Sequence, residues 1–175
     1  MINKLVLCGA SALLIISSPA LAHEAAHPND AQIAHIAYTA GALDVEAGKQ
    51  ALAKSQNEAV RSFAQTMVRD HEAVNQQALA LVKKLGVTPE PNATSTALTA
   101  QANDKAHQLG TLSGMAFDRA YVQNEIAFHQ TVNGALSTSL IPSAQNAELK
   151  TLLETGLTLF QAHQKHAEQL EKSLR

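Results

Sequence analysis

Apolar residues recur at helical spacing along four long segments of this 175-residue chain, and this periodicity constrains the fold more than any other feature. Residues three, four or seven apart lie on one face of an α-helix, so each segment predicts a helix with one apolar side. No segment shows the strict alternation of a half-buried strand, and the many alanines favour helix. We therefore expect an all-α domain.

The segments predict four long helices, at about residues 30–55, 57–85, 113–142 and 144–175. The first follows the start signal Pro28-Asn29-Asp30, Asn57 is expected to cap the second, and Gly86 is expected to end it. Ser113 is the expected cap of the third helix. Pro142 is expected to stop that helix within a short loop.

The link between the second and third helices, residues 86–112, is long. Pro89 and Pro91 exclude helix near its start, and residues from about 95 to 109 could form a short extra helix. The link is long enough to return along a helix of about 25 residues, which measures about 37 Å. One such crossover is the ferritin-like arrangement, so we predict a ferritin-like four-helix bundle. The open alternative is that the link is only an insertion.

The N-terminus is typical of a secretory signal peptide. Lys4 precedes an apolar stretch, residues 5–16, that is shorter than the roughly 20 apolar residues of a transmembrane helix. Ala20-Leu21-Ala22 then supplies a cleavage pattern. The alternative is an uncleaved anchor. We predict a signal peptide at residues 1–22 with cleavage after Ala22, a flexible leader at 23–29 and a bundle domain at 30–175.

The mature chain that this cleavage would leave offers few kinds of chemistry. Cys8, the only cysteine, lies in the signal, so a disulfide and a thiolate ligand are excluded. Without Lys4 the chain has 12 basic and 15 acidic residues, and a formal charge of −3 argues against nucleic-acid binding. The sequence contains neither a Gly-x-Ser-x-Gly motif nor a phosphate-binding loop. All eight histidines remain.

Several ionisable residues fall on or beside the apolar faces, where a charge is costly unless it is paired or binds a metal. Every expected long helix carries at least one of them. Imidazole and carboxylate groups together suit iron, zinc, copper or manganese. The candidate metal ligands are Glu46, His71, Asp118, Glu125, His129 and His163.

Glu125 and His129 lie one helical turn apart and could both reach one ion. The two Glu-x-x-His motifs of di-iron bundles do not occur, which argues against oxygen-activating di-iron chemistry. Metal-free alternatives remain open at this stage. The histidines and acids could form a hydrogen-bonded polar layer, His71 could pair with a neighbouring acid, and Asp118 could pair with a basic residue.

Three sequence blocks are distinctive when taken together. They are residues 43–49 (Leu-Asp-Val-Glu-Ala-Gly-Lys), residues 63–71 (Phe-Ala-Gln-Thr-Met-Val-Arg-Asp-His) and residues 114–122 (Gly-Met-Ala-Phe-Asp-Arg-Ala-Tyr-Val). With His129 and His163 they resemble the bacterial family called domain of unknown function 4142, over about residues 30–170.

This resemblance implies a ferritin-like fold and an exported protein, but no established activity. Members of the family are often labelled outer membrane proteins, whereas this chain has no lipid-anchor cysteine, and we expect the periplasm. In the family an acid commonly precedes the histidine of the third helix. Phe128 stands at that position here, and Glu125 is the candidate substitute.

Our leading hypothesis is a periplasmic bundle that handles a transition metal or protects the envelope from stress, without a defined turnover reaction. If the protein were an enzyme, the metal would supply redox chemistry. The rival hypothesis is a metal-free helical module that binds another envelope protein, and a third is a small-ligand pocket between the helices. Convergence of three or more candidate ligands within about 5 Å would favour the metal.

Overall fold

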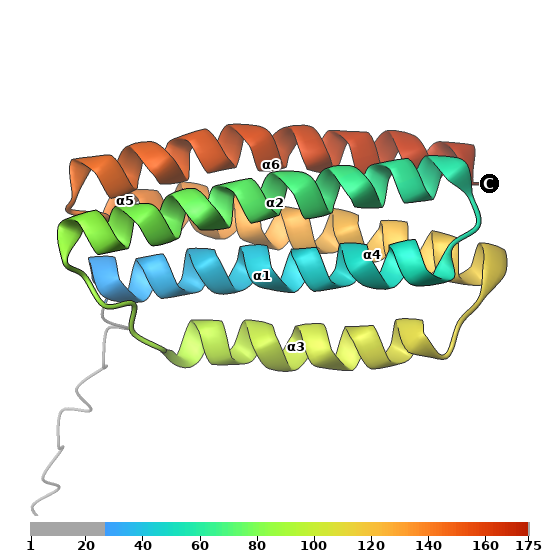
Figure 1. The fold of residues 1–175 in the computed structure, drawn as a ribbon, viewed down its shortest axis with the longest axis horizontal. Helices are drawn as coiled ribbons and strands as arrows, with labels where there is room; N and C mark the ends of the chain where they lie inside the picture. Colours follow the sequence, from blue (N-terminus) through green and yellow to red (C-terminus); the bar gives the residue numbers. More distant parts are fainter. Residues whose placement is uncertain (1–26, 175) are drawn as a thin grey trace, which may run out of the picture.

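The computed structural model describes residues 27–174, and this part of the chain is all helical, without a strand. Figure 1 shows its long helices lying lengthwise. The long helices are α1 (Asp30–Lys54), α2 (Glu58–Leu85), α3 (Ala93–Gly110), α4 (Gly114–Ala135) and α6 (Ala147–Ser173). A π-helix, η1 (Leu136–Leu140), and a short helix, α5 (Ile141–Ser143), continue α4. The expected signal peptide, Cys8 and most of the expected leader lie outside the described residues.

Asparagine caps the start of four helices. The side chains of Asn29, Asn57, Asn92 and Asn146 each accept a hydrogen bond from a backbone N–H in the first turn of the helix that follows. These N–H groups have no partner within the helix, so each cap satisfies a donor that would otherwise be unpaired. At the end of α2, Gly86 adopts the left-handed conformation with φ of 65°, which glycine allows without a steric penalty.

The end of the third predicted helix differs from the prediction. Pro142 does not stop the helix, because it lies inside α5, which ends at Ser143. The π-helix η1 comes directly before α5. Proline has no backbone N–H to donate, and the wider turn of the π-helix lies next to the position where that hydrogen bond is missing. Ser113 is the N-cap residue of α4, as expected, but its side chain makes no capping hydrogen bond.

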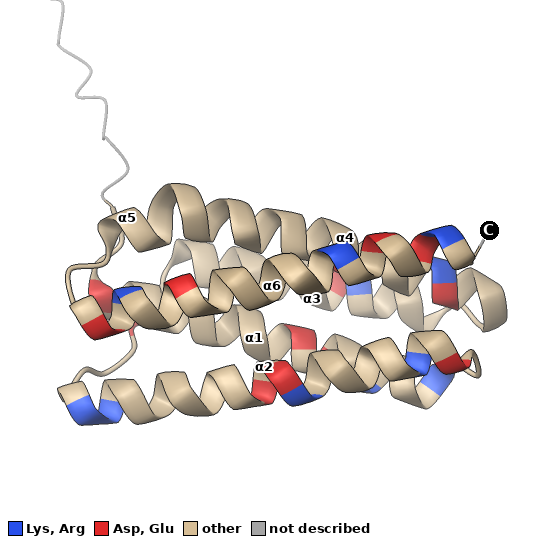
Figure 2. Ribbon diagram, turned by 90° about the horizontal axis from the view of Figure 1, so that it is seen from above, with Lys and Arg blue, Asp and Glu red and all other residues tan. Residues whose placement is uncertain are grey.

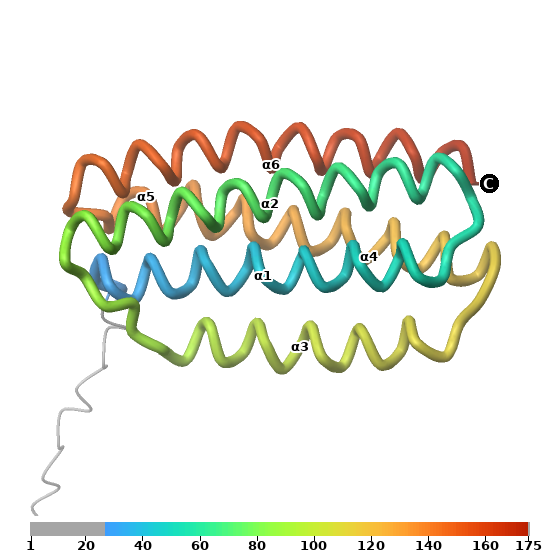
Figure 3. The backbone as a smooth tube through the Cα atoms, in the orientation of Figure 1, coloured from blue at the N-terminus to red at the C-terminus, as the bar shows by residue number. Residues whose placement is uncertain are grey.

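Four of the long helices, α1, α2, α4 and α6, lie side by side, and α3 packs on the outside of α1 (Figure 1). The tube in Figure 3 shows that α1 and α6 run in one direction and that α2 and α4 run in the other. The link from α2 to α4 therefore returns along the length of the molecule, and it does so mainly as α3.

The interior contains two apolar clusters separated by a layer of buried polar side chains. One cluster is centred on Phe63, Phe117 and Tyr121, and the other contains Ile33 and Phe160. Along each of the four central helices, a buried histidine or acid falls between a residue of one cluster and a residue of the other. These polar residues are Asp44, His71, Glu125, His129 and His163.

The charged residues of the bundle surface have mixed signs along two of its central helices. Figure 2 shows acidic and basic residues interspersed along α2 and α6. Within residues 27–174, none of the helices is both long enough and apolar enough to cross a lipid bilayer.

The absence of a side chain at Gly48 lets α1 approach α2 closely. A Cβ atom at this position would lie 2.8 Å from Cγ2 of Val68 and 3.2 Å from the backbone oxygen of Ala64. Both distances are shorter than ordinary van der Waals contact, so any side chain at residue 48 would push the two helices apart. The approach matters for the polar layer because Asp44 lies one turn earlier on α1.

We expect Gly48→Ala to lower the free energy of unfolding by about 1–3 kcal/mol through overpacking. The matched control is Gly134→Ala, because Gly134 is an exposed helical glycine whose added Cβ would meet nothing within 4 Å. This control should raise stability by about 0.5–1 kcal/mol, since glycine is a poor helix former. Urea unfolding followed by circular dichroism measures both changes. Equal effects of the two substitutions would contradict the close approach.

Candidate metal centre

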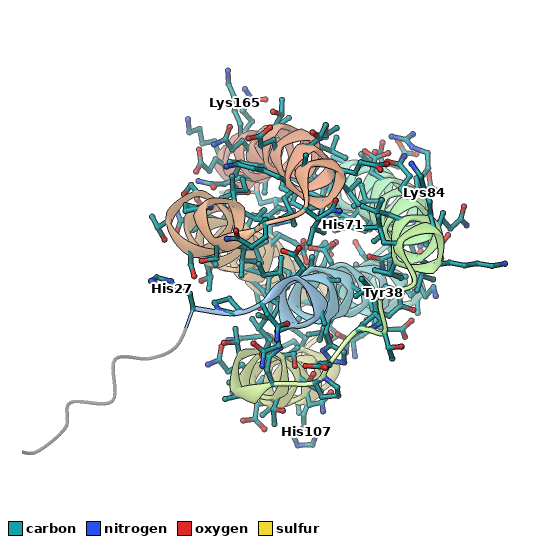
Figure 4. The ribbon with its side chains drawn as sticks, turned by 90° about the vertical axis from the view of Figure 1, so that its left-hand side faces the viewer. His27, Tyr38, His71, Lys84, His107 and Lys165 are labelled. Carbon is teal, nitrogen blue, oxygen red and sulfur yellow. The ribbon has the colours of Figure 1, made fainter. Side chains whose placement is uncertain are left out.

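The buried polar layer draws ionisable side chains from all four central helices. Asp44 comes from α1, His71 from α2, Glu125 and His129 from α4, and His163 from α6. None of the five residues is more than 4% exposed. In Figure 4, His71 points into the interior, whereas Lys84 and Lys165 point outward from the same group of helices.

The potential ligand atoms of these five residues converge. Oδ2 of Asp44 lies 3.6 Å from Nε2 of His71 and 3.7 Å from Nε2 of His129. The three histidines His71, His129 and His163 each contribute one ring nitrogen, and these three nitrogens lie within 4.8 Å of one another. The same limit holds for one ligand atom each from Asp44, Glu125 and His129. The two groups share His129, so they form a single cluster, which we call the core centre.

Two of the histidines have one ring nitrogen fixed by an acceptor outside the core centre. Nδ1 of His129 lies 2.9 Å from the backbone oxygen of Glu125, and Nε2 of His163 lies 3.0 Å from Oδ2 of Asp70. Both partners accept hydrogen bonds, so the nitrogens facing them carry the hydrogen. The other nitrogens, Nε2 of His129 and Nδ1 of His163, therefore present lone pairs. Metal-binding histidines commonly show this arrangement.

Most polar atoms that face the core centre have no hydrogen-bond partner among the described residues. This is true of both oxygens of Asp44, Oε2 of Glu125, both ring nitrogens of His71 and the free ring nitrogens of His129 and His163. A buried polar atom without a partner costs about 1–3 kcal/mol. Such a concentration of unpaired polar atoms is unusual in a packed core, where polar groups are normally satisfied.

Burial shifts the pKa of the histidines downward. It lowers the pKa of His71 to about 2 and that of His129 to about 4, with nearby histidines adding to the effect. The pKa of His163 is also lowered by burial, although the hydrogen bond to Asp70 opposes the shift. The three imidazoles are therefore neutral at neutral pH, which is the form that binds metal ions.

Burial shifts the pKa of the two acids upward. It raises the pKa of Asp44 to about 7, although the neighbouring Glu125 carboxyl group opposes the shift. Burial and the neighbouring Asp44 raise the pKa of Glu125 well above its usual range. A divalent cation at the core centre would displace the protons that these carboxyl groups hold.

Asp70 supports His163 from outside the core centre. Its carboxylate accepts hydrogen bonds from Nε of Arg69, at 2.7 Å, and from Nε2 of His163. Burial alone would raise the pKa of Asp70, but these two bonds hold it below its usual value. Phe160 provides a second support, since its ring stacks on that of His71 with centroids 4.6 Å apart. Together with the bond that holds His129, these contacts fix the orientations of all three imidazoles.

The sequence profile of the family described as "Domain of unknown function (DUF4142)" matches residues 17–170. The chain belongs to the DUF4142 family. No curated protein matches the chain significantly.

Two solved structures share the fold of this DUF4142 chain. A DUF305 fragment from Deinococcus radiodurans aligns with a TM-score of 0.71 and 18% identity, covering 82% of this chain and 95% of that one. A DUF305 protein from Streptomyces coelicolor, described as a candidate secreted protein, aligns with a TM-score of 0.69 and 12% identity. That alignment covers 82% of this chain and 91% of the other. At these identities the likeness concerns the fold alone.

The structure brings together four of the six candidate ligands that the sequence analysis named, and it separates the other two. His71, Glu125, His129 and His163 all lie in the core centre. Asp118 is buried, with 6% exposure, but it lies seven residues before Glu125 on α4, about 10 Å along the helix axis. It does not belong to the converging groups.

The position expected for Glu46, near the inner face of the first helix, was wrong. Its side chain is 73% exposed and pairs with Lys49 at 3.2 Å. Two residues along a helix correspond to a rotation of about 200°, so Glu46 does not reach the core centre that Asp44 enters. The helical register of α1 therefore places one acid in the core and the other in solvent.

Sequence reasoning missed Asp44 and Asp70. A signal for Asp44 was present, because Ile36, Ala40, Asp44 and Gly48 follow one another at intervals of four and all are buried. This series marks the centre of the buried face, whereas the neighbouring Leu43 and Ala47 are only half-buried. Asp70 gave no comparable signal, since its partner His163 lies on a different helix.

The pKa of Asp44 predicts how its removal changes stability in the metal-free protein. Because the pKa of about 7 in the folded state lies above the ordinary value of 3.8, the folded protein holds this proton more tightly. The charge therefore destabilises the fold fully above about pH 7, and the penalty disappears as pH falls toward 3.8. We compare the free energy of unfolding of Asp44→Asn with that of wild type at two pH values. The difference in favour of Asp44→Asn should be about 2 kcal/mol larger at pH 8 than at pH 5.

Urea unfolding in the presence of a chelator measures this difference. The control is Glu46→Gln, an exposed acid on the same helix, whose effect should stay within about 0.5 kcal/mol at both pH values. If the difference in stability between Asp44→Asn and wild type did not change with pH, the burial of an ionisable Asp44 would be contradicted.

Proposed function

We propose that this protein is an exported, ferritin-like bundle of the periplasm that binds one transition-metal ion at the core centre. The ligands are His71, His129 and His163, with Asp44 and Glu125. The observation that carries the proposal is the convergence of ring nitrogens and carboxylate oxygens from four helices, most of them without another partner. A divalent cation would bind these nitrogen and oxygen atoms together and would satisfy them in a core that otherwise leaves most of them without a partner.

The number of ions follows from His129. Both converging groups include this residue, but its Nδ1 donates to a backbone oxygen, so only Nε2 is free to bind. One imidazole with one lone pair binds one ion, so we propose a single ion that both groups share. The absence of paired Glu-x-x-His motifs agrees with this count.

The donor set narrows the class of metal. Three neutral imidazoles favour zinc, copper, iron or manganese over calcium and magnesium, which prefer ligand sets made of oxygen. Zinc and copper fit a histidine-rich set well, and the two carboxylates also allow iron or manganese. The role that fits such a site is metal handling or protection of the envelope from metal or oxidative stress. We do not assign a turnover reaction.

Export and the ferritin-like class have separate support. The positively charged start, apolar stretch and Ala-Leu-Ala pattern of residues 1–22 support export. The DUF305 protein of similar fold from Streptomyces coelicolor is described as a candidate secreted protein, which agrees with it. The ferritin-like class is supported by four central helices with a long connection between the second and third, occupied by α3.

The rival hypothesis, a metal-free interaction module, has less support. It requires each buried acid to pair with a basic side chain, but Asp44 and Glu125 have no lysine or arginine partner among the described ion pairs. It also requires a contiguous apolar surface. Among residues 27–174, the large exposed apolar residues are Tyr38, Leu79 and Met115, on three different helices.

The test is the metal content of the exported protein, purified without a histidine tag and measured by mass spectrometry. We expect close to one metal ion per chain, directly or after titration with zinc, copper, iron or manganese. His71→Ala and His129→Ala should each lose most of it, because each removes a central ligand. The matched control His107→Ala changes an exposed histidine on α3 (Figure 4) and should bind like wild type. A wild-type protein that takes up none of the four metals would exclude the proposal.

Asp70→Asn tests the support of His163 separately. The change weakens the acceptor that holds Nε2 of His163, and we expect the metal affinity to fall about 10–100-fold while the final stoichiometry stays the same. The control is Glu72→Gln, an exposed acid two residues further along α2. Competition with a chromophoric chelator measures both affinities. Equal affinities for wild type and Asp70→Asn would show that His163 needs no such support.

A further inference from the structure

The core centre is buried, yet a cavity connects its carboxyl side with the region beneath α3. This cavity, of about 600 Å³, lies between α1, α3 and α4. Asp44 and Glu125, each 1% exposed, contribute to its wall. It is therefore a space through which a solute could approach the two acids.

Helix α3 covers this cavity but is only lightly packed. Its two buried residues are Ser95 and Leu109, which lie near its opposite ends. Between them, Leu98 and Ala102 are half-buried and line the cavity. A helix with so few buried contacts separates from the body of the protein at a lower free-energy cost than the central helices do.

Side-chain hydrogen bonds to backbone oxygens fasten α3 to α1. Gln50 donates to the backbone oxygen of Ala106 at 2.9 Å, and Lys54 donates to that of Gly110 at 2.7 Å. Both donors lie on α1 and both acceptors in the second half of α3. Loss of either bond would let this half of α3 move away from the cavity.

The size and chemistry of the cavity fit a hydrated divalent cation. Six water molecules occupy about 180 Å³ at roughly 30 Å³ each, well within the cavity. Besides Gln50, which fastens α3, three amide side chains that can replace water molecules line it: Gln101, Asn103 and Asn124. Two lysines also line it, but Lys49 is paired with Glu46 and Glu72, and Lys105 donates to Gln108.

A second cavity, of about 460 Å³, approaches the core centre from another side, is somewhat more apolar, and has none of the five proposed ligands in its wall. Its wall includes Ile36, Val74, Leu136 and Phe160, and the ring of Phe160 stacks on His71. A hydrated cation that lost its water there would meet no carboxylate or imidazole, which makes this route less favourable. The two cavities therefore provide an internal comparison.

We propose that the cavity beneath α3 is the access route for a hydrated divalent transition-metal ion, and that Asp44 and Glu125 are the first core ligands it meets. The three histidines then replace further water molecules. This inference rests on the proposed function, since it assumes that the core centre binds a metal. It adds a role for α3, which is to cover the route, and an order in which the ligands engage.

The test is the rate of Co²⁺ uptake by the metal-free protein, followed by the absorbance of the bound ion after rapid mixing. Ala102→Trp places a large side chain in the cavity, and we expect uptake at least 10-fold slower than in wild type with the same final occupancy. Gln50→Ala removes a bond that fastens α3, and its uptake should be several-fold faster. Circular dichroism establishes that each variant is folded.

Two controls separate the route from general effects of bulk. Ala100→Trp adds the same side chain to an exposed position of α3 outside the cavity wall, and Ala135→Phe fills the second cavity instead. Both should take up Co²⁺ at the wild-type rate.

The outcomes for the access route and for the metal site are distinguishable. Slower uptake in Ala102→Trp together with faster uptake in Gln50→Ala would support the route. Wild-type rates in both variants, or slower uptake in Ala135→Phe alone, would overturn the route while leaving the metal site intact. Failure of the wild-type protein to bind Co²⁺, zinc, copper, iron or manganese at equilibrium would instead overturn the proposed function.

Discussion

The fold depends on how it accommodates five ionisable side chains in one buried layer. Apolar clusters lie on both sides of this layer, and water does not reach it as bulk solvent. In such surroundings the neutral forms of histidine and carboxylic acid are favoured, which is what the pKa shifts of His71 and Asp44 express. The metal-free protein therefore tolerates the layer by keeping its groups uncharged. A bound cation would reverse this preference for the acids and leave the histidines neutral.

Hydrogen bonds to groups beside the buried layer hold two of its histidines in place. His163 is held by Asp70, which Arg69 keeps ionised, and His129 is held by a carbonyl of its own helix. These contacts direct the remaining nitrogens inward before any ligand arrives. A polar layer that served packing alone would be expected to pair its donors and acceptors with one another. Here the supporting bonds are made outside the layer, while the atoms inside it remain unpaired.

The sequence predicted the helices well because their determinants are local. Asparagine caps and Gly86 act within a turn of the residues they affect, so the starts of α1 and α2 and the end of α2 agree with expectation. The end of the segment that begins with α4 was mispredicted, because a π-helix before Pro142 adapts the chain to a residue that usually ends a helix. That adjustment depends on the geometry of the whole turn rather than on the proline alone.

The candidate site was predicted only in part, for a reason that lies in helix packing. Periodicity identifies an apolar face that spans a wide arc, but neighbouring helices decide which line of residues within that arc faces the interior. On α1 the close contact at Gly48 sets this line, and it selects Asp44 rather than Glu46. Pairs that connect separate helices, such as Asp70 with His163, leave no trace in the spacing of either segment.

The contribution of all four central helices to one centre has a consequence for when the protein can acquire a metal. His163 lies on the last helix and Asp44 on the first, so the ligand set is complete only after the whole chain has been made and folded. A chain crossing a membrane in an extended state could not carry the proposed ion with it. Metal loading would then take place in the compartment of folding, and the metals available there would determine which ion the protein receives.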